Sequence, residues 1–163
     1  ERGDIDAAYI WLPTLDEIRK TGKDLITSRQ LAAAGKPTLD LGVVSAKFAE
    51  QHPEVVDIWR QQQARALNVI HNDPTAAATA IAAEIGLTPE QVGEQLKQTV
   101  FLTPEQIASP EWLGTDGDPG NIAVNLQNAS QFLADQKQIP AAAPVDSLRA
   151  AIYTKGLPGV LGQ

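Results

Sequence analysis

Tyr9 and Trp11 are the residues of this chain best suited to contact a small organic molecule. They lie in a short apolar run, residues 5–12, which ends at Pro13. The run is rich in β-branched and aromatic residues and too short for a free-standing amphipathic helix, so it predicts a buried strand. Aromatic side chains at the carboxyl end of a strand can form a wall of a ligand site in open α/β folds. Aromatic residues on a buried strand can also belong to the core, so the residues alone leave both interpretations open.

No other combination of residues predicts catalysis or metal binding. The sequence contains no cysteine, which excludes disulfides, zinc–thiolate sites and cysteine nucleophiles. His52 and His71 have no metal-ligand spacing and show no partnership typical of a hydrolytic triad. Asp116 and Asp118 resemble the start of a calcium loop, but Gln127 occupies the twelfth position, where such a loop needs an acid. We therefore expect no metal ion, no cofactor and no enzymatic activity.

Length and charge narrow the class of protein further. With 163 residues, 43% of them hydrophobic, the chain has the length of one domain and enough apolar side chains to bury a core. The formal net charge is -7 and no basic stripe is present, which argues against a nucleic-acid partner. No apolar stretch approaches the roughly 20 residues of a membrane span.

After the first run the pattern is mostly helical. Further short strands are expected over residues 24–27 and 39–44, and helices over residues 13–21, 29–34, 45–51, 53–72, 75–85, 121–137 and 145–153. Helix starts are also indicated at Pro89, Pro104 and Pro110, since proline fits the first helical turn and the glutamate that follows favours its positive end. In the longest helix, Trp59 falls on an apolar face and is expected in the core.

Three segments of the chain resemble one known family. Residues 3–13 read Gly-Asp-Ile-Asp-Ala-Ala-Tyr-Ile-Trp-Leu-Pro, residues 35–40 read Gly-Lys-Pro-Thr-Leu-Asp and lead into residues 43–56, and a weaker match covers residues 132–140. These motifs resemble the carboxyl-terminal half of periplasmic solute-binding proteins of the nitrate/sulfonate/taurine type, which serve ABC importers. The resemblance spans most of the chain and implies that the amino-terminal half of such a protein is missing from this sequence.

The resemblance implies an α/β fold, the helix-rich carboxyl-terminal half of a two-lobed periplasmic-binding-protein fold of type II. Residues 1–37 would form the end of the second lobe, and residues 38–163 the returning carboxyl-terminal part of the first lobe. It implies a periplasmic location. The expected partners are a small-molecule ligand, ABC permease subunits, and either the missing amino-terminal half or a second copy of the chain.

The same resemblance implies that Tyr9, Trp11, Thr38 and Asp40 contact the ligand. Asp40 would pair with a cationic group, although an aspartate ahead of an apolar strand can also simply satisfy backbone donors at a turn. In taurine-type proteins an acid often follows the tryptophan, whereas this chain has Leu12. We therefore expect capture of taurine or an alkyl sulfonate, with simple sulfonates bound at least as well as taurine.

Two other functions stay open at this point. The same fold serves enzymes of thiamine-pyrimidine synthesis, which would need a cofactor-anchoring lysine or histidine in the cleft, and none is recognisable in this sequence. A helical interaction module that shares only a few strand residues with the family is the other alternative. Such a module would fold stably alone, without exposed sheet edges.

Overall fold

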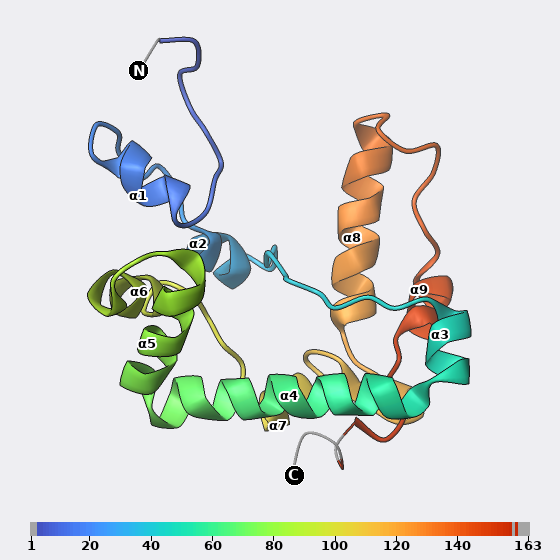
Figure 1. Ribbon diagram of the computed structural model, residues 1–163. Helices are drawn as coiled ribbons and strands as arrows, with labels where there is room; N and C mark the ends of the chain where they lie inside the picture. Colours follow the sequence, from blue (N-terminus) through green and yellow to red (C-terminus); the bar gives the residue numbers. More distant parts are fainter. Residues whose placement is uncertain (1–2, 158, 160–163) are drawn as a thin grey trace.

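The computed structural model describes residues 3–157 and 159, and this part of the chain is built mainly from helices (Figure 1). The helices are α1 (Thr14–Arg19), α2 (Ser28–Ala33), α3 (Ala46–Gln51), α4 (Pro53–Asn72), α5 (Pro74–Ile85), α6 (Pro89–Leu96), α7 (Pro104–Ile107), α8 (Ile122–Asp135) and α9 (Val145–Ala151). Two short strands, β1 (Gly114–Thr115) and β2 (Asp118–Pro119), pair antiparallel. None of the described helices has both the length and the apolar character needed to cross a membrane.

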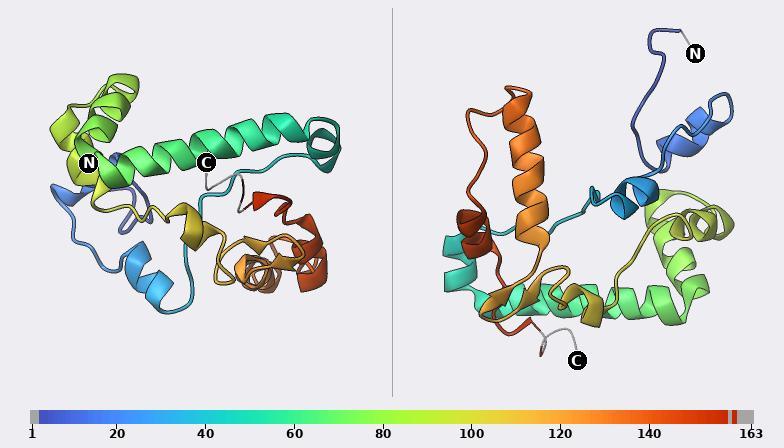
Figure 2. Two further views of the ribbon diagram at one scale, coloured as in Figure 1. Left: turned by 90° about the horizontal axis from the view of Figure 1, so that it is seen from below. Right: turned by 180° about the vertical axis from the view of Figure 1, so that it is seen from behind.

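Helix α4 organises the fold, since other helices gather near its two ends (Figures 1 and 2). Helices α5 and α6 lie at its carboxyl end, whereas α3 and α9 lie near its amino end. Val56, Arg60 and Ala64 are the buried residues of α4, and their spacing of four places them on one face of the helix. The buried face of α4 is therefore a single stripe of residues along the helix.

The α5–α6 hairpin encloses one small core. Gly86 ends α5 with φ 71°, a left-handed conformation that glycine adopts without strain. Thr88 then begins α6 with a capping box, in which Thr88 and Gln91 each satisfy a backbone N–H of the other. The core consists of the buried Ala78, Ala82 and Val92 with the partly buried Ile81, Leu87 and Leu96 around them.

A second core joins α4 to the segment that follows α9. The buried residues Ala64 and Leu157 meet there, packed by Ile107, Ala108 and Leu113. Next to it, the Arg60 guanidinium pairs with Asp57, donates to the Lys155 carbonyl at 2.9 Å, and lies 5.2 Å from the centroid of the Tyr153 ring. Arg60 thus ties the middle of α4 to residues 153–155.

The helices predicted from the sequence are confirmed with small shifts at their ends. Ser45 caps α3 as local helix-start rules require, and Thr103 caps α7 with a capping box. The helix start predicted at Pro110 is wrong. There the chain folds back on itself, with the Gly114 N–H bonded to the Ser109 carbonyl at 2.9 Å, so no helix can propagate.

The predicted strands over residues 5–12, 24–27 and 39–44 are wrong for the described structure, in which β1 and β2 are the only strands. A strand is stabilised by hydrogen bonds to a neighbouring strand, and these segments have none with any residue that the structure describes. The expected core position of Trp59 is also wrong, since this residue is 51% exposed. The predicted helix-rich character is confirmed, and the two-lobed α/β arrangement stays a prediction.

The chain exposes far more surface than a compact domain of its size. Its accessible surface is 11723 Å² for a mass of 17.4 kDa. Folded monomeric proteins of that mass expose about 7,900 Å². Large apolar residues account for part of the excess, including Ile5, Trp11, Leu25, Val43 and Phe132, each more than half exposed. Such a surface is typical of a protein part that packs against something else.

Candidate functional site

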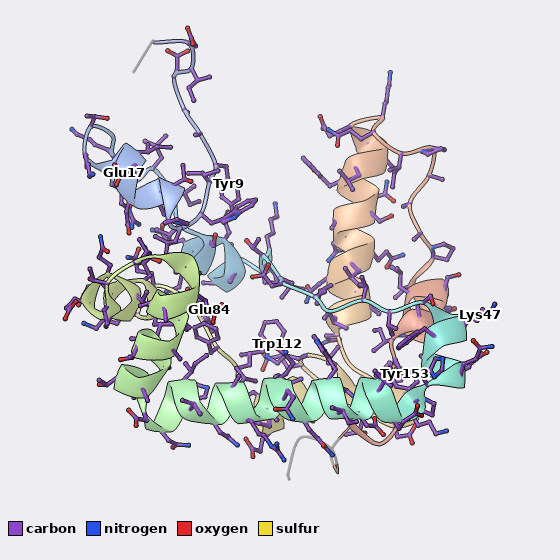
Figure 3. The ribbon with its side chains drawn as sticks, viewed as in Figure 1. Tyr9, Glu17, Lys47, Glu84, Trp112 and Tyr153 are labelled. Atoms are coloured by element: carbon purple, nitrogen blue, oxygen red, sulfur yellow. The ribbon has the colours of Figure 1, made fainter. Side chains whose placement is uncertain are left out.

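Three hydroxyl groups from distant parts of the chain meet at Tyr9. The Tyr9 phenol oxygen lies 2.9 Å from Ser28 Oγ and 3.1 Å from Thr38 Oγ1, both hydrogen-bond distances. Tyr9 belongs to the segment before α1, Ser28 opens α2, and Thr38 lies in the linker between α2 and α3. Figure 3 shows Tyr9 close to α2. The structure therefore brings together two of the predicted site residues, Tyr9 and Thr38, and adds Ser28, which the sequence analysis did not select.

Local hydrogen bonds fix the elements that carry these hydroxyls. Thr27 caps α2, since its side chain accepts from the Gln30 N–H while the Gln30 side chain accepts from the Thr27 N–H. This capping box sets the position of Ser28, the next residue. Before it, Arg19 closes the turn after α1 by donating to both carboxylate oxygens of Asp24, at 3.1 and 2.9 Å. The same guanidinium lowers the pKa of the Asp24 carboxyl, which favours the charged pair.

The hydroxyl cluster stabilises negative charge on the Tyr9 oxygen. The hydrogen bond with Ser28, and next that with Thr38, lowers the pKa of the Tyr9 phenol below its ordinary value. The partners of Tyr9 are hydroxyls rather than a histidine or a carboxylate, so the cluster offers hydrogen bonds but no activated nucleophile. Such a group can position the polar head of a ligand.

Trp11 and Asp40, the other two predicted site residues, stand free of this cluster. Trp11 is 70% exposed, and its carbonyl accepts from the Leu15 N–H at the start of α1. Asp40 is exposed, and its carboxylate has no hydrogen bond or ion pair with any described residue. Both side chains are therefore accessible to a ligand, and their part in a site stays a prediction.

A separate hollow of about 740 Å³ lies against α5 and α6, close to the end of α4. Apolar residues such as Ile70, Ala78 and Leu96 share its lining with polar and charged residues, among them Arg29, His71, Glu90 and Lys97. The sequence analysis missed this hollow because its lining comes from four helices and the segment after α6, with no common motif. It contains none of the predicted site residues.

The described residues contain no group of three or more His, Cys, Asp or Glu side chains arranged to hold a metal ion. Asp116 and Asp118, considered above for calcium, lie in and beside the two-residue strands of the β1–β2 hairpin. The arrangement at Tyr9 offers hydroxyl groups for polar contacts with a ligand.

Comparison with known proteins supplies the decisive observation. Over 149 aligned residues the chain is 35% identical to the taurine-binding periplasmic protein of Escherichia coli (strain K12). This chain is a relative of a taurine-binding periplasmic protein. The resemblance predicted from the motifs at residues 3–13 and 35–56 is thereby confirmed. The relative is named as a binding protein and not as an enzyme.

The match takes in 88% of this chain but 44% of the taurine-binding relative. The chain therefore spans less than half of the length of that protein. No family model matches the chain, and no solved structure matches it either.

Proposed function

We propose that this chain is part of a periplasmic solute-binding protein that captures taurine or an alkyl sulfonate and delivers it to an ABC permease. The observation that carries the proposal is the 35% identity with the taurine-binding relative across 88% of the chain. The proposed activity is binding without catalysis. The net charge of -7 and the absence of a basic stripe accord with a small-molecule ligand instead of a nucleic acid.

The candidate ligand contacts each suit one part of such a molecule. The hydroxyl cluster of Tyr9, Ser28 and Thr38 can donate one hydrogen bond to a sulfonate oxygen, because two of its three protons are used in the bonds at Tyr9. The exposed indole of Trp11 would cover the alkyl carbons, and Asp40 would face the ammonium group of taurine. Helix N-termini and polar groups of the part outside this chain would complete the anion site.

The proposed architecture has two lobes that close on the ligand. In it, residues 1–37 end the second lobe and residues 38–163 return to the first. The bond between Tyr9 and Thr38 supports this division, since it ties together the two segments that would meet at the boundary. The extended, poorly paired course of residues 39–44 suits a crossing between lobes.

The experiment uses a chimera in which this chain replaces the matching segment of the Escherichia coli taurine-binding periplasmic protein. Calorimetry would compare taurine with ethanesulfonate, its analogue without the amino group. Because Leu12 replaces an acid, we expect ethanesulfonate to bind at least as well as taurine. Losing one charge-assisted contact costs about 1.5–3 kcal/mol, so a hundredfold preference for taurine over ethanesulfonate would contradict this expectation. Absence of binding by both sulfonates would overturn the proposed function.

A matched pair of variants assigns the ammonium contact. Asp40→Asn in the chimera should lower the affinity for taurine by about 10-fold or more. It should leave the affinity for ethanesulfonate unchanged, since only taurine carries the cation. Asp116→Asn, which removes an exposed acid in the β1–β2 turn, should change neither affinity. Equal effects of the Asp40 variant on both ligands would place Asp40 outside the site.

A further inference from the structure

The hollow against α5 and α6 contains a cation without a counter-charge. Arg29, on α2, is part of its lining, and the guanidinium has no hydrogen bond or ion pair with any described residue. Lys97, also in the lining, is neutralised, since its ammonium lies 2.6 Å from a carboxylate oxygen of Glu94. In a chain of net charge -7, the unpaired guanidinium of Arg29 is suited to hold an anion from outside the chain.

The acid of the lining, Glu90, is bound to its own helix. Its carboxylate accepts hydrogen bonds from its own backbone N–H and from the Thr88 hydroxyl, and these bonds lower the pKa of the Glu90 carboxyl. The positive amino end of α6 favours the same charged form. Among the described residues, no ion pair joins Glu90 to Arg29. The guanidinium therefore keeps its charge for a ligand.

The lining also includes a glycine that the fold itself does not require. Gly93 lies inside α6, where glycine is a much poorer helix former than alanine. Its backbone does not have the positive φ that would favour glycine. A Cβ atom at this position would have no heavy atom of another described part of the chain within 4 Å, so no neighbour needs the space either. The missing side chain leaves the α6 backbone open to the hollow, which allows a ligand to approach it closely.

Around this glycine the lining is largely apolar. Ile70 from the end of α4, Leu96 from α6, and Val100 and Phe101 from the segment after α6 contribute side chains. Val100 is 59% exposed, so much of its apolar surface is free to be covered. The hollow measures about 740 Å³, and pockets that take drug-sized ligands measure about 300–1,000 Å³. A matching ligand therefore has an apolar body as well as an anionic group.

We propose that this hollow binds an amphipathic carboxylate, a molecule with one carboxylate head and a flexible apolar chain. Arg29 holds the head, since the planar guanidinium fork matches the two oxygens of a carboxylate. The apolar chain lies across Gly93 and covers Leu96 and Phe101. The site shares no residue with the hydroxyl cluster at Tyr9, so it is additional to the proposed sulfonate site and does not depend on it.

The test uses decanoate as the probe and calorimetry on the chimera, so that the rest of the binding protein is present. Decanoate should bind with the same affinity whether or not taurine is present at a saturating concentration. Competition by taurine would place decanoate in the sulfonate site and overturn the proposal, as would a complete absence of decanoate binding. If the chimera binds decanoate but no sulfonate, the hollow stands as a site and the proposed function fails.

A pair of arginine variants tests the head group. Arg29→Gln should weaken decanoate binding by about 10-fold or more, because a charge-assisted contact is lost. It should leave the affinity for decanol unchanged, since decanol has the same chain without the charge. Arg65→Gln, which removes an exposed arginine of α4 outside the lining, is the matched control and should change neither affinity. Decanoate binding that Arg29→Gln leaves intact would overturn the proposal.

Two variants of Gly93 test the place of the apolar chain. Gly93→Leu fills the open part of the lining and should weaken both decanoate and decanol by about 10-fold or more. Gly93→Ala adds only one methyl group, so it is the matched control and should weaken them less. Neither variant should lower the urea midpoint, because leucine and alanine both favour a helix over glycine. A loss of affinity is then not a loss of folding. Unchanged binding of both probes by Gly93→Leu would overturn the proposal.

Discussion

Tyr9 and Thr38 are 29 positions apart in the sequence, yet their hydroxyl oxygens lie 3.1 Å from each other. This bond joins the segment before α1 to the linker after α2, and Ser28 completes the cluster at 2.9 Å from the same phenol oxygen. The region that carries the motif over residues 3–13 is thus connected to the region that carries Thr38 and Asp40. Removing one of the three hydroxyl groups should therefore change the hydrogen bonding of the others.

The first prediction concerns ionisation of Tyr9. Because Ser28 and Thr38 lower the pKa of the Tyr9 phenol, tyrosinate should form below the ordinary value of about 10. Tyr153 is the other tyrosine, so the measurement uses Tyr153→Phe and follows tyrosinate absorbance against pH. Adding Ser28→Ala should raise the midpoint more than adding Thr38→Ala, since the Ser28 bond contributes most. A midpoint at or above about 10 in the Tyr153→Phe chain would contradict the cluster.

The same shift sets the sign of a pH effect on stability. The folded-state pKa of Tyr9 is lower than the unfolded one, so between the two values the unfolded chain holds more protons. The contribution of Tyr9 to the free energy of unfolding should therefore rise with pH across that window and be absent below it. Tyr9→Phe should remove this rise in urea titrations at alkaline pH.

The second prediction separates two exposed tryptophans. Trp11→Ala in the chimera should weaken sulfonate binding by about 1–3 kcal/mol, the scale of one buried aromatic contact. It should change stability by no more than about 0.5 kcal/mol, since Trp11 is 70% exposed in this chain. Trp59→Ala should cost about 1–2 kcal/mol of stability, because half of this residue is buried, partly against Gly42. Calorimetry measures the affinity of both variants, and urea unfolding measures their stability. If Trp11→Ala unfolds the protein but leaves the affinity unchanged, Trp11 belongs to the core.

Features that depend on residues close together in the sequence could be predicted, whereas features that depend on distant partners could not. Helix starts such as Thr88 and Thr103 depend on residues three positions away, so the pattern alone predicts them. The strands over residues 5–12 and 39–44 depend on partner strands elsewhere, and residues 3–157 and 159 provide none for them. Ser28 gave no signal, because a serine at the start of a helix has the same appearance whether or not it meets a distant tyrosine.

The third prediction compares two Asp-x-x-Arg pairs on helices. In α4 the Arg60 side chain is 8% exposed and pairs with Asp57, whereas in α9 the Arg149 side chain is 49% exposed and pairs with Asp146. Asp57→Asn leaves a buried guanidinium without its counter-charge and should cost about 1–3 kcal/mol. Asp146→Asn should cost less than about 0.5 kcal/mol, because water already screens that pair. Urea unfolding of the two variants measures both values.

Arg60 itself provides the control for that comparison. Its Nε and Nη1 atoms are buried and have no hydrogen-bond partner among the residues that the structure describes, which makes the charge costly to keep. Arg60→Met removes the charge and these unpaired donors together, so it should destabilise the chain less than Asp57→Asn does. A larger loss for Arg60→Met would show that the stacking on Tyr153 and the bond to the Lys155 carbonyl dominate instead.

The last prediction concerns the cap that holds α6 on α5. Helix α6 has 8 residues and is too short to be stable alone, so it depends on its capping box and on Val92, which is 2% exposed. Thr88→Ala should cost about 1 kcal/mol, measured as a lower urea midpoint with an unchanged slope. Thr79→Ala is the matched control and should change stability less, because the Thr79 hydroxyl donates only to the Thr75 carbonyl within α5.

The effect of Thr88→Ala should also depend on pH. The backbone N–H of Glu90, and next the Thr88 hydroxyl, lower the pKa of the Glu90 carboxyl. A lowered pKa means that the stabilisation is present above the unfolded-state value and is lost as pH falls through the folded-state value. The difference between the wild type and Thr88→Ala should therefore shrink in acid but persist, since the bond from the Gln91 N–H to the threonine oxygen needs no charge. A difference that grows as pH falls would contradict this account of the cap.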